Sequence, residues 1–522
     1  MAICEATIDE RVTAPRSTTA AAVSSQDDSI PRIKPLPIVS SLRNPVRSAF
    51  SGDNGKVSLD ANPQFAAAQG ILRRLKSEGF EAYLAGGCVR DLLLGRKPKD
   101  YDVATSARPE IVLDLFPRTF SVGAHFGVVL VASEGNGQST LTEVATFRSD
   151  GDYSDGRHPD QVRYTLSAEE DVQRRDFTIN GLLLDGLDEH KGGLRDSVLD
   201  FVGGLDDLDV GIVRAIGKPE LRFDEDHLRM LRAVRFAARF GFEIESTTAD
   251  AIRSLAPKIA AVSRERVRDE LTRMLTEGQA RRAFELLDET GLLAQVLPEV
   301  TRLKGVAQPP EWHPEGDVWI HTLMLLEQLE AGAPMTLAWG ALLHDIGKPA
   351  TFQAPKSPDD RIRFNGHVEI GVSIGADICR RLRFSNDETA QILALIENHM
   401  RFGDAPRMKT STLKRFFRLN NFPEHLALHR MDCMASSCNL ELYHFAEKRF
   451  RTMPAEEVRP VPLLTGRELI AAGYEPGAAF KVMLLAVEEA QLNGAIHTQD
   501  EALELIRTHF PLSAVRDSSG SA

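Results

Sequence analysis

The spacing of apolar residues changes along this chain, and the change predicts two regions of different structural class. Helical spacing begins at 63–80, and the next apolar run, EAYLAGG, has the length of a short strand. Two more strand-like runs, FGVVLVAS (126–133) and STLTEVATF (139–147), follow it. After about residue 218 nearly every segment has helical spacing. We therefore expect an α+β chain in which a mixed sheet with helices precedes an all-helical array.

Proline, glycine and composition set the limits of the predicted elements. The helical spacing is interrupted at 298, 305–316, 354–359 and 454–466. Residues 1–60 are rich in Ser, Thr, Ala, Pro and Gly and lack sustained periodicity, so we expect a disordered tail there. The polar stretch SDGDYSDGRHPDQ (149–161) has the composition of a mobile loop. A hydrophobic content of 43% supplies cores for roughly three domains.

Charge and cysteine usage narrow the class of protein. The five cysteines (Cys4, Cys88, Cys379, Cys433 and Cys438) form no C-x-x-C pair, which argues against a disulfide framework and favours the cytoplasm. The chain has no apolar run of about eighteen residues and no secretory signal pattern, so no membrane partner is expected. With a net charge of -13, it must meet any nucleic acid with a local basic surface.

The segment GGCVRDLLLGRKPKDYD (86–102) combines a glycine turn with two carboxylates. Gly86 and Gly87 lack a Cβ, so backbone N–H groups can approach an anion at the start of the predicted helix. Asp100 and Asp102, alternating in a predicted strand, should point to one face and repel each other unless a divalent cation lies between them. Oxygen-only ligands favour Mg2+. A triphosphate on the turn, near Arg90, would then be open to in-line attack by a hydroxyl. The alternative is an ordinary turn followed by a surface D-x-D.

A third carboxylate often completes such a metal site. Glu143 in STLTEVATF is the candidate by position. Alternation along a strand would equally well place this side chain on a solvated face. We therefore expect Glu143 either beside the two aspartates or in solvent.

A stripe of one acid and three arginines follows in DEDHLRMLRAVR. Asp226, Arg229, Arg232 and Arg235 recur every three positions along a predicted helix, so each step turns the stripe by about 60 degrees. A carboxylate beside a guanidinium can hydrogen-bond the Watson–Crick edge of a base, and could select cytosine and adenine without a template. The alternative is a solvated helix face with i,i+3 ion pairs, and it is strongest for Arg235, half a turn from Asp226.

The helical region carries histidines and aspartates in the order H…HD…H…H…D. They are His321, His344, Asp345, His367, His399 and Asp432. Such side chains on separate helices can converge on one or two cations, and a mixed nitrogen and oxygen set suits Mn, Ni, Fe or Co better than Mg2+. A metal-bound water is a nucleophile near neutral pH, which predicts hydrolysis of a phosphomonoester or a 2′,3′-cyclic phosphate. Any one of these histidines alone would more simply be structural.

Four motifs between Leu84 and Phe242 resemble the tRNA nucleotidyltransferase and bacterial poly(A) polymerase family, the class II nucleotidyltransferases. They are GGCVRD with DYD, RRDFTINGLLLD (174–185), FDEDHLRMLRAVRFAARFGF (223–242) and the intervening TFRSDGDYSDGRHP (146–159). The resemblance implies a catalytic head of nucleotidyltransferase fold. It also implies that Arg175 binds nucleotide and that Asp176 contacts the sugar or orders the site.

The same resemblance implies roles for the stripe and for the helical region. Asp226 and Arg229 would select the base, with Arg232 and Arg235 near the nucleotide or its phosphates. The histidine and aspartate set is similar to that of the HD phosphohydrolase family, which implies one metal held by four of the residues. Those four are His321, His344, Asp345 and Asp432, while His367 and His399 would add ligands or contact phosphate. Lys348 in HDIGK is the candidate for phosphate binding.

Together these resemblances imply an enzyme that adds C, C and A to tRNA 3′ ends from CTP and ATP, with Mg2+ in the head. The HD site would hydrolyse terminal phosphates of damaged tRNA ends. A poly(A) polymerase, or an enzyme that adds only CC or only A, is the alternative within the class. A non-catalytic RNA-binding protein on the same scaffold is the alternative outside it. The oligomeric state stays open.

The expected domains follow the pattern changes and the motifs. They are a tail (1–60), a head (61–217), a helical neck for nucleotide selection and RNA binding (218–305), an HD domain (306–455) and a C-terminal tRNA-binding segment (456–522). Basic residues with interleaved aromatics at 408–422 and 447–453 could contact RNA. The alternative for the first stretch is a solvated basic helix with Phe416 and Phe417 in the core.

Overall fold

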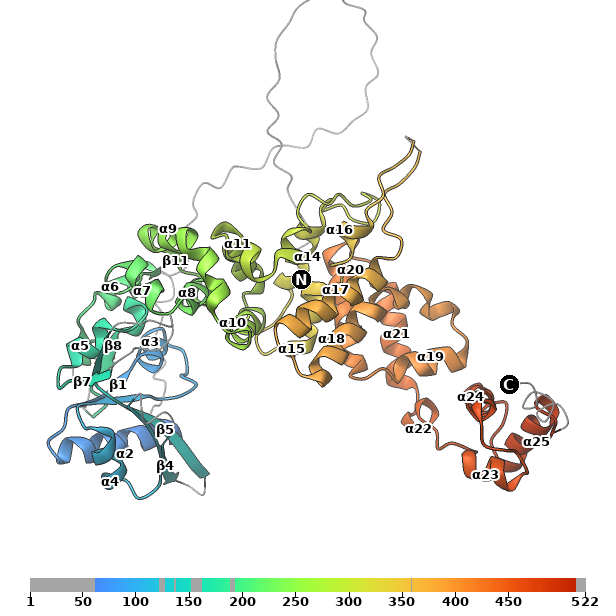
Figure 1. Cartoon of the computed structure of the whole chain (residues 1–522), viewed down its shortest axis with the longest axis horizontal. Coiled ribbons are helices and arrows are strands. Elements are labelled where there is room, and N and C mark those ends of the chain that lie inside the picture. Colours follow the sequence, from blue (N-terminus) through green and yellow to red (C-terminus); the bar gives the residue numbers. More distant parts are fainter. Residues whose placement is uncertain are drawn as a thin grey trace, which may run out of the picture. The chain divides into compact units, whose positions relative to one another are not determined.

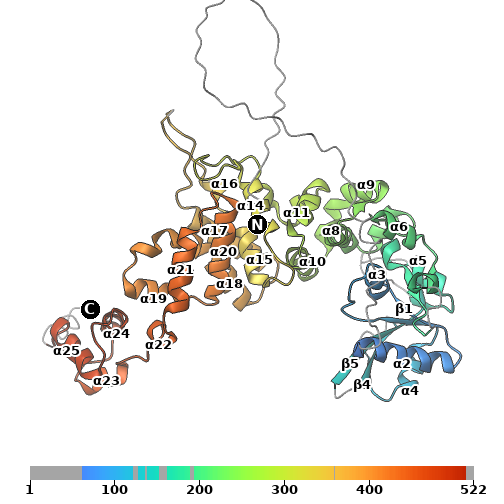
Figure 2. The same ribbon diagram turned by 180° about the vertical axis from the view of Figure 1, so that it is seen from behind.

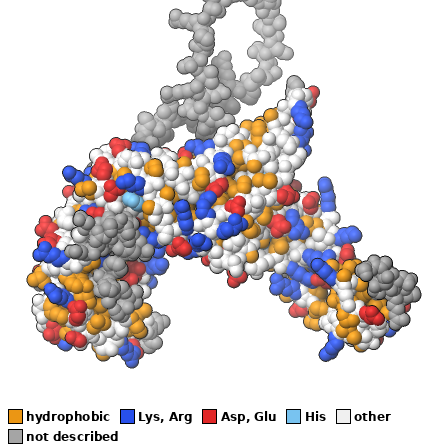
Figure 3. Space-filling model, in the orientation of Figure 1, with side chains coloured by type: hydrophobic (Ala, Val, Ile, Leu, Met, Phe, Trp, Pro, Cys, Tyr) orange, Lys and Arg blue, Asp and Glu red, His pale blue; other side chains and the backbone are white. Residues whose placement is uncertain are grey.

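The computed structural model describes residues 62–121, 127–135, 138–151, 162–187, 193–357 and 359–512. The tail predicted over 1–60 and residues 152–161 of the predicted mobile loop lie outside these ranges. Within the described part, no helix combines the length and apolarity that crossing a lipid bilayer requires. Figure 3 shows basic, acidic and apolar side chains interspersed on the face it presents.

A seven-stranded mixed sheet forms the centre of the head, in the order β3-β4-β5-β2-β1-β8-β9 (Figures 1 and 2). The strands are β1 (Ala82–Ala85), β2 (Val103–Thr105), β3 (Thr119–Ser121), β4 (Val128–Gly135), β5 (Gln138–Thr146), β8 (Leu182–Leu184) and β9 (Val198–Asp200). The pair β2 and β5 is parallel, and the other neighbours are antiparallel. The mixed sheet is therefore confirmed, and the predicted strand-like runs EAYLAGG, 126–133 and 139–147 correspond to β1, β4 and β5.

Two helices cover one face of this sheet. They are α2 (Pro63–Ser77) and α4 (Pro109–Leu115), and both contact β4 and β5. Val129, Val131 and Val144 point into this layer and are almost fully buried, because alternate residues of a strand face opposite sides of its sheet. The long strands β4 and β5 therefore present their other alternate residues on the opposite side of the sheet.

Shorter elements connect the strands of the head. They are α3 (Gly87–Leu93), α5 (Ala168–Gln173), η3 (Thr178–Asn180), η4 (Leu194–Ser197) and α6 (Gly204–Val210). A separate hairpin of β6 (Arg148–Asp150) and β7 (Val162–Tyr164) flanks the predicted mobile loop.

The neck is helical apart from one short strand pair. Its elements are α7 (Pro219–Glu225), α8 (Leu228–Phe240), α9 (Ser246–Leu255), η5 (Ala256–Ala261), α10 (Arg264–Thr276), α11 (Ala280–Glu289), α12 (Leu292–Val296) and α13 (Pro298–Thr301). β11 (Glu243–Ile244) pairs in parallel with β10 (Ile212–Val213), so the helical array is not purely helical here. Two residues are too few for a periodic signal, and the sequence pattern therefore could not indicate this pair.

The region after the neck is helical, as predicted. Its elements are α14 (Val318–Glu327), α15 (Met335–Leu343), α16 (Lys348–Thr351), α17 (His367–Arg381), α18 (Asn386–Asn398), η6 (His399–Arg407), α19 (Thr410–Phe417), α20 (Phe422–Ala435), α21 (Glu441–Thr452) and α22 (Ala455–Val458). The first of these helices share a continuous apolar core with the head and neck, while residues around Phe416 form a second cluster.

Three helices end the described chain. They are α23 (Gly466–Ala471), α24 (Ala478–Leu492) and α25 (Gln499–His509), and they enclose an apolar cluster of their own. The mixed sheet of the head and the helical region behind it confirm the predicted α+β class.

Candidate active sites

The glycine turn after β1 brings an arginine against bare backbone. Gly86 has φ of 72°, and a Cβ on it would lie 3.1 Å from Nη1 of Arg175. The Gly86 N–H donates to the carbonyl of Leu182 on the neighbouring strand β8, which fixes the turn at the end of β1. The turn therefore has the two features that a phosphate seat needs, close access to backbone and a nearby cation.

We expect Gly86→Ala to weaken the binding of CTP and ATP by about tenfold, because a side chain at this φ is strained by about 1–2 kcal/mol and would displace Arg175. Gly95→Ala is the matched control, since Gly95 has φ of 66° with no atom within 4 Å of the added Cβ. Titration of nucleotide against both variants measures the difference. Equal affinities would contradict the phosphate seat.

The two aspartates of DYD lie directly before β2 and not within it, which corrects the predicted strand position. The chain is nevertheless extended there: Tyr101 is buried, while Asp100 is exposed and Asp102 half-buried. Val103 pairs in parallel with Val144, so the preceding residues, Asp102 and Glu143, lie side by side. The structure thus brings all three predicted carboxylates together.

The ionisation of Asp102 reflects this crowding. Burial and the negative charges of Asp100 and Glu143 raise its pKa to about 7, and Arg175 acts in the opposite direction. A carboxyl kept protonated by its neighbours gains most from a bound cation. Oxygen donors alone, with excess negative charge, fit Mg2+.

This raised pKa predicts a pH dependence of metal binding. Below about pH 7 Asp102 holds a proton that Mg2+ must displace, so the affinity for Mg2+ should increase as the pH rises from 6 to 8 and level off above that. The Mg2+ concentration that gives half-maximal nucleotide binding, measured at each pH, tests this expectation. A constant value across this range would contradict it.

Ion pairs hold the second motif around the turn. Arg175 bonds Asp171 at 2.9 Å, and Asp176 bonds Arg232 of α8 at 2.7 Å and Asn180 at 3.0 Å. Although burial opposes ionisation of Asp176, Arg232 and Asn180 lower its pKa. Asp176 therefore links the head to the neck through Arg232.

The acid of the predicted stripe is not on the helix, which corrects the sequence interpretation. Asp226 lies between α7 and α8 in extended backbone, where Arg266 of α10 contacts it at 2.7 Å. Arg229 pairs with Glu225 at 2.5 Å instead. Asp226 and Arg229 still line one cavity, because α8 begins immediately after the acid.

Two predicted nucleotide ligands are held by protein groups. Arg235 is 4% exposed and bonds Glu270 of α10 at 2.7 Å, so it is not on the solvated helix face with i,i+3 ion pairs that was the alternative for this residue. Arg90 is equally buried, bonds Asp91 and Asn180, and lies 4.6 Å from the Phe240 ring centroid. Both line the cavity, and their role in nucleotide binding stays a prediction.

One cavity of about 900 Å³ joins these groups. Of the predicted residues its lining includes Gly86, Gly87, Arg90, Asp100, Asp102, Arg175, Asp226, Arg229, Arg232 and Arg235. The sequence interpretation missed further cations in the lining: Arg96, Lys99, Arg174, Arg239, Arg266 and Arg273. Nothing in the sequence next to these residues distinguished them from ordinary surface cations, since arginine on a helix is commonly solvated.

The six predicted residues of the HD set converge in the helical region. Nε2 of His321 lies 3.3 Å from Nε2 of His344 and 3.1 Å from Oδ1 of Asp432. On the other side, Nε2 of His367 and Nε2 of His399 are 3.4 Å apart, and each is 3.8 Å from Oδ1 of Asp345. Asp345 therefore lies between two histidine pairs and could share its oxygens between them.

Each histidine of this set has its Nδ1 occupied. The partners are the carbonyls of Ala341, Phe364 and Ile396 for His344, His367 and His399, and Glu315 for His321. All four Nε2 atoms thus face the centre, an orientation that metal-ligating histidines share because the outer partner fixes the tautomer. The donor set fits a transition metal.

The buried charges of the HD set balance one another within the protein. Although burial opposes ionisation, His344 and Lys348 hold the pKa of Asp345 well below its ordinary value. Burial also opposes a charged His321, but bonds to Asp432 and Glu315 raise its pKa to about 9. Burial lowers the pKa of His399 to about 4. Lys348 and a protonated His321 therefore balance the negative charge of Asp345 and Asp432. A bound metal ion would supply that positive charge instead.

The sequence interpretation missed the outer partners of the HD set. Glu315 accepts from both His313 and His321 at 2.8 Å, and Lys348 contacts Gln308 at 2.6 Å as well as Asp345 at 2.7 Å. Gln308, His313 and Glu315 lie within 305–316, a segment without helical spacing whose only signal was its proline and glycine content. Lys348 is the predicted phosphate ligand, and its contacts with Gln308 and Asp345 were not predicted. A cavity of about 570 Å³ opens beside the set, lined in part by Trp312, Arg361 and Ser436.

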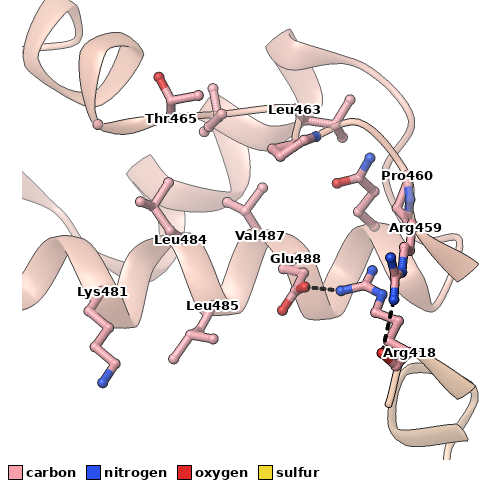
Figure 4. A pocket seen from close by; sticks show the side chains of 14 residues that line it. Arg418, Arg459, Pro460, Leu463, Thr465, Lys481, Leu484, Leu485, Val487 and Glu488 are labelled. Carbon is pink, nitrogen blue, oxygen red and sulfur yellow. Dashed lines mark hydrogen bonds and ion pairs between the residues drawn. The ribbon is translucent and has the colours of Figure 1, made fainter. Parts of the chain in front are cut away.

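The basic stretch at 408–422 is mostly occupied by protein contacts. Phe416 and Phe417 are buried, which confirms the core alternative. Arg415 and Arg418 pair with Glu488 of α24, and Arg418 lies at the end of an apolar groove of about 930 Å³ (Figure 4). Arg415 and Arg418 therefore form ion pairs within the protein and are not available to contact RNA in this structure.

Three family models match successive parts of the chain. Residues 82–214 match the family described as "Poly A polymerase head domain", 241–304 match "Probable RNA and SrmB- binding site of polymerase A", and 317–432 match "HD domain". The fold and sites thus define a polymerase-type nucleotidyltransferase head joined to an HD domain.

Relatives of known name narrow this class. The CCA-adding enzyme of Latilactobacillus sakei is 39% identical over 291 residues, which are 54% of this chain and 70% of that enzyme. The CCA-adding enzyme of Geobacillus thermodenitrificans is 44% identical over 250 residues, 48% of this chain and 57% of the relative. The chain thus spans little more than half of that relative. The chain belongs to the CCA-adding enzyme family.

A solved structure extends the likeness to most of the chain. The Bacillus stearothermophilus CCA-adding enzyme in complex with CTP superposes with a TM-score of 0.64 at 28% identity. The superposition covers 88% of this chain and all of the other.

Proposed function

We propose that this protein adds C, C and A to the 3′ end of tRNA from CTP and ATP without a template. The observation that carries this proposal is that Asp100, Asp102 and the glycine turn with its neighbour Arg175 line one cavity, while Glu143 lies close enough to Asp102 to raise its pKa. Membership of the CCA-adding family, and a structural neighbour whose crystals contain CTP, support the choice of substrates.

Different residues of the chain bind the triphosphate and the metal ion in nucleotidyl transfer. Gly86, Gly87 and Arg175 seat the triphosphate, and the carboxylates of Asp100, Asp102 and Glu143 hold Mg2+. When bound, Mg2+ neutralises phosphate charge and lowers the pKa of the attacking hydroxyl. The turn and the carboxylates, fixed on adjacent strands, orient the α-phosphate relative to the incoming 3′ end.

The neck selects the base. Asp226 accepts from a base amino group and Arg229 donates to a ring nitrogen or carbonyl, donors and acceptors that cytosine and adenine both offer. Arg266 orients the Asp226 carboxylate, and Arg232, held by Asp176, supplies positive charge beside the nucleotide. The ion pairs keep these side chains in place between additions.

An assay with defined nucleotides tests this function. Purified protein is incubated with tRNA transcripts that lack CCA, with CTP alone, ATP alone and both, and the products are sized on a sequencing gel. We expect addition of CC with CTP alone and of CCA with both. Long A tails would indicate a poly(A) polymerase, and a single A or a stop at CC in the presence of both nucleotides would indicate a partial enzyme.

We propose a second function, metal-dependent phosphohydrolysis, for the HD set. The orientation of four Nε2 atoms toward Asp345 and Asp432 favours it. The set would hold a transition metal such as Mn, Ni, Co or Fe, which supplies a nucleophilic water. Lys348 and Arg361 line the approach and suit a phosphate or 2′,3′-cyclic phosphate at an RNA end.

A further inference from the structure

The sheet face that carries Glu143 continues into an exposed apolar surface on β3, β4 and β5. Phe120, Leu130 and Glu143 are aligned partners on these three strands, so their side chains point to the same side. Leu141 lies two residues from Glu143 on the same strand and therefore shares this face. Phe120 is 56% exposed and Leu141 57%.

This surface differs from the other side of the same strands. There α2 and α4 cover the sheet and bury the alternate valines, and Figures 1 and 2 both show these helices together on one side of the β4–β5 hairpin. Large apolar side chains that are exposed together commonly mark a binding surface. Phe120, Leu130 and Leu141 form the surface that we call the β3–β5 face.

The order of the strands indicates which reacting group approaches the carboxylates over this face. Asp102 has the glycine turn of β1 on one side and Glu143 of β5 on the other. In phosphoryl transfer the attacking and leaving oxygens are roughly in line across the phosphorus. With the triphosphate on the glycine turn, the leaving pyrophosphate lies on the β1 side. The attacking 3′-hydroxyl must therefore arrive from the β5 side, over the β3–β5 face.

We propose that the β3–β5 face is the docking surface for the unpaired 3′ end of the acceptor RNA, with its last base stacked on Phe120 and Leu141. This inference rests on the proposed nucleotidyl transfer. The acceptor ends in the last base of the tRNA itself before the first addition and in C before the next two, so a site that reads the edge of a single base would not fit every step. Stacking tolerates every base, because all four have a π face.

The alternative occupant of an apolar sheet face is another protein or a second copy of this chain. Glu143 stands on the same face, two residues from Leu141, and a protein seated there would cover a carboxylate that must remain open to substrate. The RNA end is therefore the occupant that the position of Glu143 favours.

Substitutions on this face test the proposal in the full-length protein. For Phe120→Ala with Leu141→Ala we expect the KM for tRNA transcripts lacking CCA to increase by about tenfold or more, the loss of one stacked base. The KM for CTP should stay unchanged. Phe120→Trp should keep the wild-type KM for RNA. Leu113→Ala, an exposed apolar residue on α4 across the sheet, is the matched control and should change neither constant.

A binding measurement separates this proposal from the proposed function. A transcript ending in 4-thiouridine is irradiated with the Asp102→Asn variant, and we expect a crosslink to the peptide containing Phe120 or Leu141. If the wild-type protein added no nucleotide, the proposed function would fail while this crosslink still decided the docking surface. A crosslink elsewhere would overturn the proposal. An unchanged KM for RNA in the double variant would also overturn it, whether or not the oligomeric state of that variant changes.

Discussion

Asp102→Ala should reduce the rate of nucleotide addition by about a thousandfold or more while leaving tRNA affinity within about twofold. Burial and the negative charges of the neighbouring Asp100 and Glu143 raise the pKa of the Asp102 carboxyl. Its loss removes a ligand shared by the bound Mg2+, and several kcal/mol of charge stabilisation in the transition state correspond to this factor. Single-turnover addition of labelled CTP to a transcript lacking CCA measures the rate, and filter binding measures the affinity.

Loss of folding cannot easily imitate this result. The pKa of Asp102 is raised, so the folded metal-free protein holds this proton more tightly than the unfolded chain and is destabilised by ionisation as the pH rises from about 4 through about 7. Alanine at position 102 should therefore maintain or increase the melting temperature of the metal-free protein above pH 7. Asp114→Ala, on the exposed side of α4, is the matched control and should retain wild-type activity. Wild-type addition by Asp102→Ala would remove the metal assignment.

The second large effect is expected at the HD set. His344→Ala should abolish metal-dependent hydrolysis of a nucleoside 2′,3′-cyclic phosphate, a loss of about a hundredfold or more, and leave CCA addition unchanged. Nε2 of His344 lies beside both His321 and Asp345, so its removal opens the centre of the set. Ligand losses of this kind weaken metal binding severely, since even outer partners contribute about 10–100-fold. Release of the 2′- or 3′-monophosphate, with Mn, Ni or Co restored after chelation, measures hydrolysis.

Two further variants make this result specific. His344→Gln keeps more of the buried volume and should show the same loss, so that a failure of His344→Ala to fold would not decide the outcome. His444→Ala removes an exposed histidine of α21 in the same region and should keep full hydrolysis. Simultaneous loss of CCA addition in soluble, folded His344→Gln would show that the two sites are coupled, and hydrolysis at the wild-type rate would exclude the set as the hydrolytic centre.

The arginines of this protein show why residue type alone does not establish a ligand. Arg90, Arg175 and Arg235 all line the same cavity. Arg235 is bonded to Glu270, Arg90 to Asp91 and Asn180, and Arg175 to Asp171, but only Arg175 of these three also lies against the backbone of Gly86. Asn180 and Glu270 come from distant segments of the chain, and the short motifs that contain Arg90 and Arg235 do not include them.

The sequence by itself determined the elements and the chemical types of the two sites. Strand and helix periods are local properties, so the strands at EAYLAGG, 126–133 and 139–147 could be predicted without the fold. The glycine pair, the D-x-D and the ordered histidines also stand in short segments whose chemistry is evident from the residues themselves.

Only the tertiary structure decided which of these groups meet. The parallel pairing of β2 with β5 places Glu143 beside Asp102 across forty residues of chain, and a break between α7 and α8 moves Asp226 off its predicted helix to Arg266. Glu315 became a partner of His321 through a segment without periodicity. Strand order and helix packing depend on burial summed over the whole chain, and the local pattern of residues does not specify that sum.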